Sequence, residues 1–188
     1  AACIVATGDA DAMVTGTTRN YYASLKDIKR VIAIEKEKIL FGLSIMITRT
    51  RTLFIADSTV IHTPTSEQLA DIAVQAASKA RALGHTPRVA LLSFANFGNP
   101  TMTGTERIHE AKEILNKRKV DFEYDGEMSA DVALNKELLE LYPFSGLSEP
   151  ANILIMPGLH SANIAAKLLG QVGGGQVLGP LLTGFSKP

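Results

Sequence analysis

Segments with helical periodicity alternate along this chain with short, continuous apolar runs, and this alternation limits the possible folds more than any other feature. The clearest helix is predicted over Thr65 to Leu83, where apolar residues recur at helical spacing behind a Thr-x-x-Gln capping box. Directly after it, the run from Arg88 to Ser93 is typical of a strand covered on both faces. The alternation predicts an α/β fold with a mostly parallel sheet and helices on both faces.

Other segments continue this pattern. We expect a helix over about 106–117, a buried strand over 151–156 and a helix over about 162–169. Two further strand-like runs, 39–47 and 52–57, are separated by only four residues, which suits an antiparallel hairpin. The sheet is therefore expected to be mixed.

The composition excludes several classes of partner and site. The 19 basic and 19 acidic residues cancel and no run of five like charges occurs, so no nucleic acid is expected to bind. The single cysteine, Cys3, excludes an internal disulfide framework and suits a reducing, cytoplasmic location. No apolar stretch reaches the ~20 residues of a membrane helix, so no membrane contact is expected. The sequence starts without methionine or a leader pattern, and we expect it to begin inside a longer chain.

Polar loops follow the predicted strands, and ligands of open α/β sheets bind beyond the carboxyl ends of strands. The first loop begins at Asp57, the second runs from Ser93 to Gly104, and the third leads from Pro157 to a helix N-terminus that favours an anion. The last two supply the candidate ligand contacts Ser93, Asn96, His160, Ser161 and Asn163.

Each candidate also has a purely structural interpretation, which stays open. Asp57 is also a common turn former, Ser93, Asn96 and Asn99 also suit helix capping, and His160 also suits a partly buried histidine. Asp125-Gly-Glu127 is interpreted as a turn carrying two acids, and no metal site is expected there. No phosphate-binding loop, dinucleotide-binding or nucleophile-elbow motif occurs. The periodicity of helices and strands does not identify which residue would act as a general base.

Six stretches, taken in order, resemble the phosphate acetyltransferase and phosphate butyryltransferase family. They are Gly8–Gly16, Pro64–Ala73, Asp125–Asp131, Ala151–Pro157, Ser161–Ile164 and Gly179–Pro188. The resemblance implies the two-domain fold of isocitrate and isopropylmalate dehydrogenase-like enzymes. Residues 1–31 are then expected to complete the first half of domain 1, residues 32–179 to form domain 2, and residues 180–188 to return to domain 1.

Finer details resemble one branch of that family. Asp121–Leu134, Tyr142–Phe144 and Leu159–Ala162 look like the C-terminal phosphotransacetylase-like domain of bacterial NADP-dependent malic enzymes. The resemblance implies a regulatory, homo-oligomerising module that binds acetyl-CoA in an interdomain cleft and holds no prosthetic group. NADP and a divalent metal would belong to an N-terminal malic enzyme half.

The alternative is an active phosphate acetyltransferase, which converts acetyl-CoA and phosphate into acetyl phosphate and CoA. That reaction needs a base for the thiol, donors for phosphate and an oxyanion stabiliser. Where the family has an arginine that holds phosphate, this chain has Lys26, which keeps the charge but lacks the bidentate fork. The family's Ser-Arg pair and aspartate base match nothing before Pro188, so the catalytic residues stay unknown. Arg19, Lys26 and Arg30 are the basic residues expected to contact acetyl-CoA or acetyl phosphate.

Overall fold

The computed structural model describes residues 1–16, 18–99 and 105–188. They divide into two compact units: unit 1 contains residues 1–40 and 182–188, and unit 2 contains residues 41–181. The domain boundaries predicted after residues 31 and 179 each fall before the corresponding division. The assignment of these units to the two domains of the dehydrogenase-like fold stays a prediction.

Unit 1 is built around two short helices, α1 (Ala2–Thr7) and α2 (Tyr21–Val31). The side chain of Asn20 begins α2 by accepting a hydrogen bond from the Tyr22 N–H at 2.9 Å. Apolar residues from both helices and from the chain end pack together; they are Val5, Ile28 and Ile32, with Leu182 and Phe185 against them. Segments far apart in the sequence therefore share one small core.

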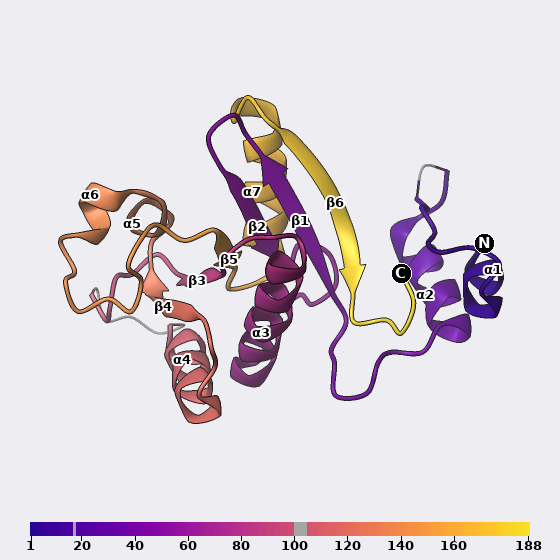
Figure 1. Ribbon diagram of the computed structural model, residues 1–188, viewed down its shortest axis with the longest axis horizontal. Helices are drawn as coiled ribbons and strands as arrows, with labels where there is room; N and C mark the ends of the chain where they lie inside the picture. The colour runs from indigo at the N-terminus through magenta and orange to yellow at the C-terminus, as the bar shows by residue number, and fades with distance from the viewer. Residues whose placement is uncertain (17, 100–104) are drawn as a thin grey trace. The chain divides into compact units, whose positions relative to one another are not determined.

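Unit 2 contains a six-stranded sheet with the strand order β4-β3-β5-β2-β1-β6 (Figure 1). The strands are β1 (Phe41–Ile47), β2 (Thr52–Ala56), β3 (Arg88–Leu92), β4 (Glu123–Met128), β5 (Ile153–Ile155) and β6 (Gln176–Thr183). β2, β5, β3 and β4 run parallel to one another, and β1 pairs with β2 in the antiparallel direction. The predicted mixed, mostly parallel sheet is confirmed, as is the hairpin, in which Leu43 faces Ala56.

Helices cover both faces of this sheet (Figure 1). α3 (Ser66–Ala82) packs on β2, β3 and β5, and its buried side is mostly alanine: Ala70, Ala73, Ala76, Ala77 and Ala80 are at most 1% exposed. α4 (Glu106–Arg118) packs beside α3. A separate core cluster joins α5 (Ala130–Leu134), α6 (Lys136–Leu139) and α7 (Leu159–Val172) to alternate residues of the strands, such as Ile55, Ala90 and Leu154. Because neighbouring strand residues face opposite sides, this cluster and α3 lie on opposite faces.

The sequence predicted α3 almost to the residue, including its capping box, in which Thr65 and Gln68 bond each other's backbone N–H groups at 3.2 and 3.0 Å. The turn predicted at residues 125–127 is wrong, because these residues lie inside β4. β6 was not predicted, since most of its side chains are exposed and it has no buried apolar pattern.

Candidate functional site

Four parallel strands of unit 2 end at the same edge of the sheet, because β2, β5, β3 and β4 all point in one direction. The loops that follow them contain the polar residues selected from the sequence. Residues 100–104, the end of the predicted second loop, lie outside the described part of the chain. The candidate site is therefore built from the loops after β2, β3 and β5, together with β4.

The loop after β2 is organised by the carboxylate of Asp57, which is 3% exposed. Its Oδ1 accepts hydrogen bonds from the N–H groups of Gly42, Thr59 and Val60 at 2.8, 2.8 and 3.0 Å. Its Oδ2 accepts from the N–H groups of Val60 and Ile61 at 3.2 and 2.6 Å. Asp57 thus has the turn-forming role that the sequence left open, and both of its oxygens are engaged by the backbone.

The loop after β3 is fastened to β4 and to the start of α5. The Ser93 N–H donates to the Met128 carbonyl at 2.9 Å, and Ser93 Oγ accepts from the N–H two residues later at 3.3 Å. Asn96 Oδ1 accepts from the Ser129 N–H at 2.8 Å, and the Ser129 hydroxyl, whose proton bonds Asp131, lies 3.0 Å from it. Neither Ser93 nor Asn96 caps α4, whose N-cap is Thr105, so the capping interpretation of these residues is wrong.

Glu127 lies beneath the same loop and is 4% exposed. Its Oε1 accepts a hydrogen bond from the Gly98 N–H at 3.0 Å, and its main-chain oxygen accepts one from the Phe97 N–H at 2.8 Å. Among the described residues Oε2 has no hydrogen-bond partner. The Phe97 ring packs against Tyr142 and Phe144 at centroid distances of 4.9 and 5.0 Å. The N–H groups of residues 97 and 98 are therefore used inside the protein.

Asp125 is a second buried acid of β4, at 2% exposure. Lys112 Nζ pairs with its Oδ1 at 2.5 Å, and the Gly146 N–H donates to its Oδ2 at 2.6 Å. Sequence reasoning missed both acids of β4 as buried groups, because it identified strands by continuous apolar runs and this segment is interrupted by charged residues. A lysine on the facing helix is the one signal that could have suggested their burial.

The loop after β5 leads into α7, where three of the predicted residues lie. His160 is exposed, which contradicts its interpretation as a partly buried histidine. Ser161 Oγ donates to the Gly158 carbonyl at 2.7 Å, and Asn163 Nδ2 donates to the Ser58 carbonyl at 3.4 Å. The N-cap residue of α7 is Gly158, which has no side chain to cap the helix. Asn163 therefore joins α7 to the Asp57 loop.

The predicted cations belong to unit 1, whereas the other five candidates belong to unit 2. Arg19 and Arg30 both pair with Asp27, at 3.3 and 3.4 Å, and their side chains stay 67% and 65% exposed. Lys26 is exposed on α2. No hydrogen bond within the described ranges joins Ser93 or Asn96 to His160, Ser161 or Asn163. A common ligand site for all eight residues stays a prediction.

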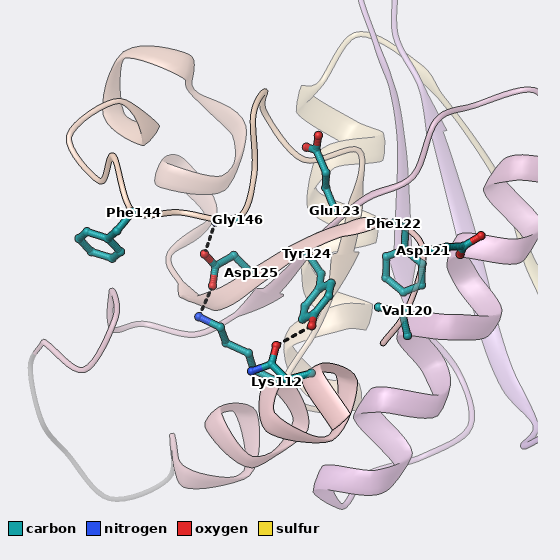
Figure 2. Close-up of a pocket in the computed structure, with 10 residues that line it drawn as sticks. Lys112, Val120, Asp121, Phe122, Glu123, Tyr124, Asp125, Phe144 and Gly146 are labelled. Carbon is teal, nitrogen blue, oxygen red and sulfur yellow. Dashed lines mark hydrogen bonds and ion pairs between the residues drawn. The ribbon is translucent and has the colours of Figure 1, made fainter. Parts of the chain in front are cut away.

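A solvent-open hollow of about 570 Å³ lies beside α4 and β4 (Figure 2). The Lys112–Asp125 pair lies on its wall, and the Tyr124 hydroxyl donates to Asn116 Oδ1 at 2.5 Å. Burial raises the pKa of Tyr124, and the negative charges of Asp125 and Glu113 raise it further. None of the eight predicted site residues lines this hollow.

Residues 1–16, 18–99 and 105–188 offer neither a metal cluster nor a membrane-spanning helix. They contain no group of three or more His, Cys, Asp or Glu side chains placed to hold a metal ion. They also contain no helix that is both long and apolar enough to span a membrane.

Comparison with known sequences covers the whole chain. The family model described as phosphate acetyl/butaryl transferase matches residues 1–188. The NADP-dependent malic enzyme of Rhizobium meliloti (strain 1021) is 53% identical over 187 residues, which are 100% of this chain and 25% of that protein. The phosphate acetyltransferase of Treponema pallidum is 40% identical, over 100% of this chain and 60% of that protein. The chain thus spans about a quarter of the malic enzymes it matches.

Solved structures agree with the sequence match. A phosphotransacetylase from Streptococcus pyogenes superposes with a TM-score of 0.90 at 29% identity, over 98% of this chain and 57% of that one. A branched-chain phosphotransacylase from Enterococcus faecalis superposes with a TM-score of 0.82 at 28% identity, over 100% of this chain and 68% of that one. The resemblance that the six sequence stretches indicated is confirmed: the chain belongs to the phosphate acetyl/butaryl transferase family.

Proposed function

We propose that this chain is a phosphotransacetylase-like module of a malic enzyme, and that it binds acetyl-CoA as a regulatory ligand instead of converting it. The observation that carries the proposal is the 53% identity to an NADP-dependent malic enzyme along the entire chain. A malic enzyme half that binds NADP and a divalent metal would then be the covalent partner. Occupancy of the module would change the activity of that half through linked equilibria.

The chemistry of the candidate site favours binding over transfer. Transfer needs a base oriented towards the CoA thiol, and an oriented base has a second group that holds it. The two buried carboxylates nearest the strand ends, Asp57 and Glu127, both accept hydrogen bonds from backbone N–H groups. His160 is exposed, and no hydrogen bond within the described residues orients it. Oε2 of Glu127 has no partner among the described residues, but this side chain is only 4% exposed, so the described loops present ligand donors and no base that is both exposed and oriented.

Each unit, taken by itself, offers groups that suit an anionic ligand. Ser161 and Asn163 lie on the first two turns of α7, whose N-cap residue Gly158 has no side chain, and a helix N-terminus favours negative charge. Arg19, Lys26 and Arg30 offer positive charge on unit 1, and Lys26 has no ion pair within the described residues. These cations would hold the phosphates of CoA, and no step of a reaction is assigned to any of them.

Titration calorimetry of the full-length protein with acetyl-CoA tests this proposal. We expect saturable binding in the micromolar to millimolar range, and a change in the rate of malate-dependent NADP reduction at the same concentrations. An absence of binding heat at millimolar acetyl-CoA would rule out the sensing role.

A pair of variants on α7 tests where the ligand lies. His160 and Lys167 are both exposed, so replacing either by alanine should change the free energy of unfolding by less than about 0.5 kcal/mol. If the ligand contacts the start of α7, His160→Ala should weaken acetyl-CoA binding several-fold, about 1 kcal/mol, whereas Lys167→Ala should not. Equal affinities for both variants would place the ligand elsewhere.

We also propose that unit 2 forms a homodimer or higher homo-oligomer through α7 and β6. Exposed apolar side chains gather there: Ile164, Leu168 and Val172 on α7 are 62%, 58% and 72% exposed, and Leu178 and Leu181 on β6 are each 47% exposed. β6 is an edge strand with β1 as its neighbour. The two elements are close together, since a Cβ on Gly170 would lie 3.0 Å from Val177 Cγ2. A second copy of the chain would cover this surface.

The second candidate function is phosphate acetyltransferase activity. It is favoured by the 40% identity to a phosphate acetyltransferase and by the superposition on solved phosphotransacetylases. An assay of thiol release from acetyl-CoA, with phosphate present and the full-length protein as enzyme, decides between the two. Turnover of ~1 per second or faster would favour the enzyme, and its absence at high protein concentration would favour the sensor.

A further inference from the structure

The loop after β2 contains an arrangement that the proposed function does not use. Four backbone N–H groups, from Gly42, Thr59, Val60 and Ile61, converge on a single carboxylate at 2.6–3.2 Å. Three of these N–H groups are consecutive along the chain, and successive N–H groups that converge in a turn form an anion-binding concavity. The carboxylate is that of Asp57, and no cationic side chain within the described residues pairs with it.

The close approach of the loop to β1 explains how these N–H groups meet. A Cβ on Gly42 would lie 2.2 Å from Thr59 Oγ1, so only glycine lets the loop come this near. Ser58 closes the same turn, since its N–H and its hydroxyl both donate to the Gly42 carbonyl, at 3.0 and 3.2 Å. An ionised carboxylate is costly to bury unless hydrogen bonds compensate it, and here the backbone supplies them.

We propose that Asp57 is the resident anion of a backbone anion site, and that removal of its carboxylate leaves a site that binds a small carboxylate such as formate. In the native protein the site is filled, so this loop does not take a phosphate group of a ligand. The converging N–H groups of the loop are bonded to the Asp57 carboxylate, and these bonds hold the loop in its conformation.

That shape positions the start of α7. The Ser58 carbonyl accepts a hydrogen bond from Asn163 Nδ2 at 3.4 Å, and the His62 carbonyl accepts one from the Leu159 N–H at 3.1 Å. Asp57 is therefore a positioning residue for the part of α7 that the proposed function assigns to ligand contact. This last step rests on the proposed function, whereas the anion site itself does not.

Chemical rescue of the full-length Asp57→Ala variant tests the site. In carboxylate-free buffer its thermal unfolding midpoint should fall by about 5–10 °C, because four N–H groups lose their acceptor. Formate up to ~0.1 M should raise the midpoint in a saturable way, as expected for a ligand that binds only the folded state. Chloride at equal ionic strength should not. Asp71→Ala is the matched control, because it removes a carboxylate that pairs with a side chain, Arg118 at 2.7 Å.

Several outcomes would overturn the proposal. They are an unchanged midpoint for Asp57→Ala, and a formate response no larger than that of Asp71→Ala. If Asp57→Ala folds only in formate, its refolding yield replaces the midpoint as the readout.

Hydrogen exchange of the unmodified protein is a second test. The amide protons of residues 59–61 should exchange slowly, and added inorganic phosphate should not change their exchange rates. Slower exchange in phosphate would show that phosphate binds there, and that Asp57 does not fill the site. None of these measurements uses acetyl-CoA, so their failure is distinguishable from failure of the proposed function.

Discussion

Single residues of unit 2 show three ways of compensating a buried carboxylate. Several backbone N–H groups surround Asp57, a lysine and backbone N–H groups hold Asp125, and within the described residues one backbone N–H, that of Gly98, holds the Glu127 carboxylate. Because transfer of a charge out of water is costly, the consequence of losing a partner differs among the three. Asp125 gives the clearest prediction, since its partner Lys112 can be replaced without changing the strand.

Lys112→Met should lower the free energy of unfolding by about 2–4 kcal/mol, because it leaves Asp125 buried without its positive partner. Lys117→Met on the same helix removes an exposed lysine and should change stability by less than about 0.5 kcal/mol. Urea unfolding followed by circular dichroism compares the two. Equal stabilities of the two variants would mean that the backbone hydrogen bonds of Asp125 are enough to stabilise its buried carboxylate without Lys112.

A second residue-scale prediction concerns Asp131. The hydrogen bond from the Ser129 hydroxyl lowers the pKa of Asp131, and the Val132 N–H lowers it further. Because this pKa is lower in the folded state, the carboxylate stabilises the fold above its unfolded pKa, and the contribution is lost as pH falls through the folded pKa. Ser129→Ala should therefore raise the pKa of Asp131, as followed by carbon-13 NMR titration. The pKa of Glu149, which Lys136 lowers, should stay the same.

At the scale of elements, sequence patterns identified those that bury apolar residues. α3 was predictable because its apolar face, capping box and terminal glycine all agree. β4 was not, since its buried side chains include Asp125 and Glu127. The loop of Ser93 and Asn96 was recognised as polar, yet its partners Met128 and Ser129 lie more than thirty positions further on, where local spacing says nothing about contact.

The capping box of α3 can be tested directly. Thr65→Ala removes the oxygen that accepts the Gln68 N–H and should cost about 1 kcal/mol of unfolding free energy. Thr65→Ser keeps a hydroxyl in the same place and should cost much less. Thermal unfolding of the two variants under identical conditions gives the comparison, and a loss as large for serine as for alanine would exclude capping as the cause.

β4 depends on a glycine where another strand approaches it. Gly126 has φ +150°, and a Cβ there would lie 2.5 Å from the Leu91 carbonyl oxygen. Gly126→Ala should therefore cost about 3 kcal/mol or more, from backbone strain and overpacking together. Gly84 also has positive φ, at +85°, but open space around it, so Gly84→Ala should cost about 1–2 kcal/mol. Denaturant midpoints that fall equally would show that the contact with Leu91 relaxes freely.

At the scale of the whole molecule, the sequence predicted the fold class and the family correctly, because matching stretches extend along the entire chain. It could not test the predicted ligand site. Three of the eight proposed contacts lie in unit 1 and five in unit 2, and spacing along the chain does not report how distant segments meet. The proposed function requires a ligand contact at these residues, so binding experiments test it.

The proposed oligomer has a whole-molecule test. Leu168→Glu places a charge in the exposed apolar surface of α7 and should shift the mass measured by light scattering towards the monomer at micromolar concentration. Val14→Glu, at a residue that is 98% exposed in unit 1, should leave the mass unchanged. If Leu168→Glu keeps the native mass, the subunits associate through another surface.

The alanine face of α3 has a consequence for how this protein tolerates sequence change. Five alanines that are at most 1% exposed form the buried side of α3, and adding methylenes to a well-packed core is destabilising. In a library of random substitutions, the least tolerant positions should therefore include these small buried alanines, because a larger side chain there lowers the stability of the fold. On this face of the helix, selection should therefore act mainly against substitutions that add volume.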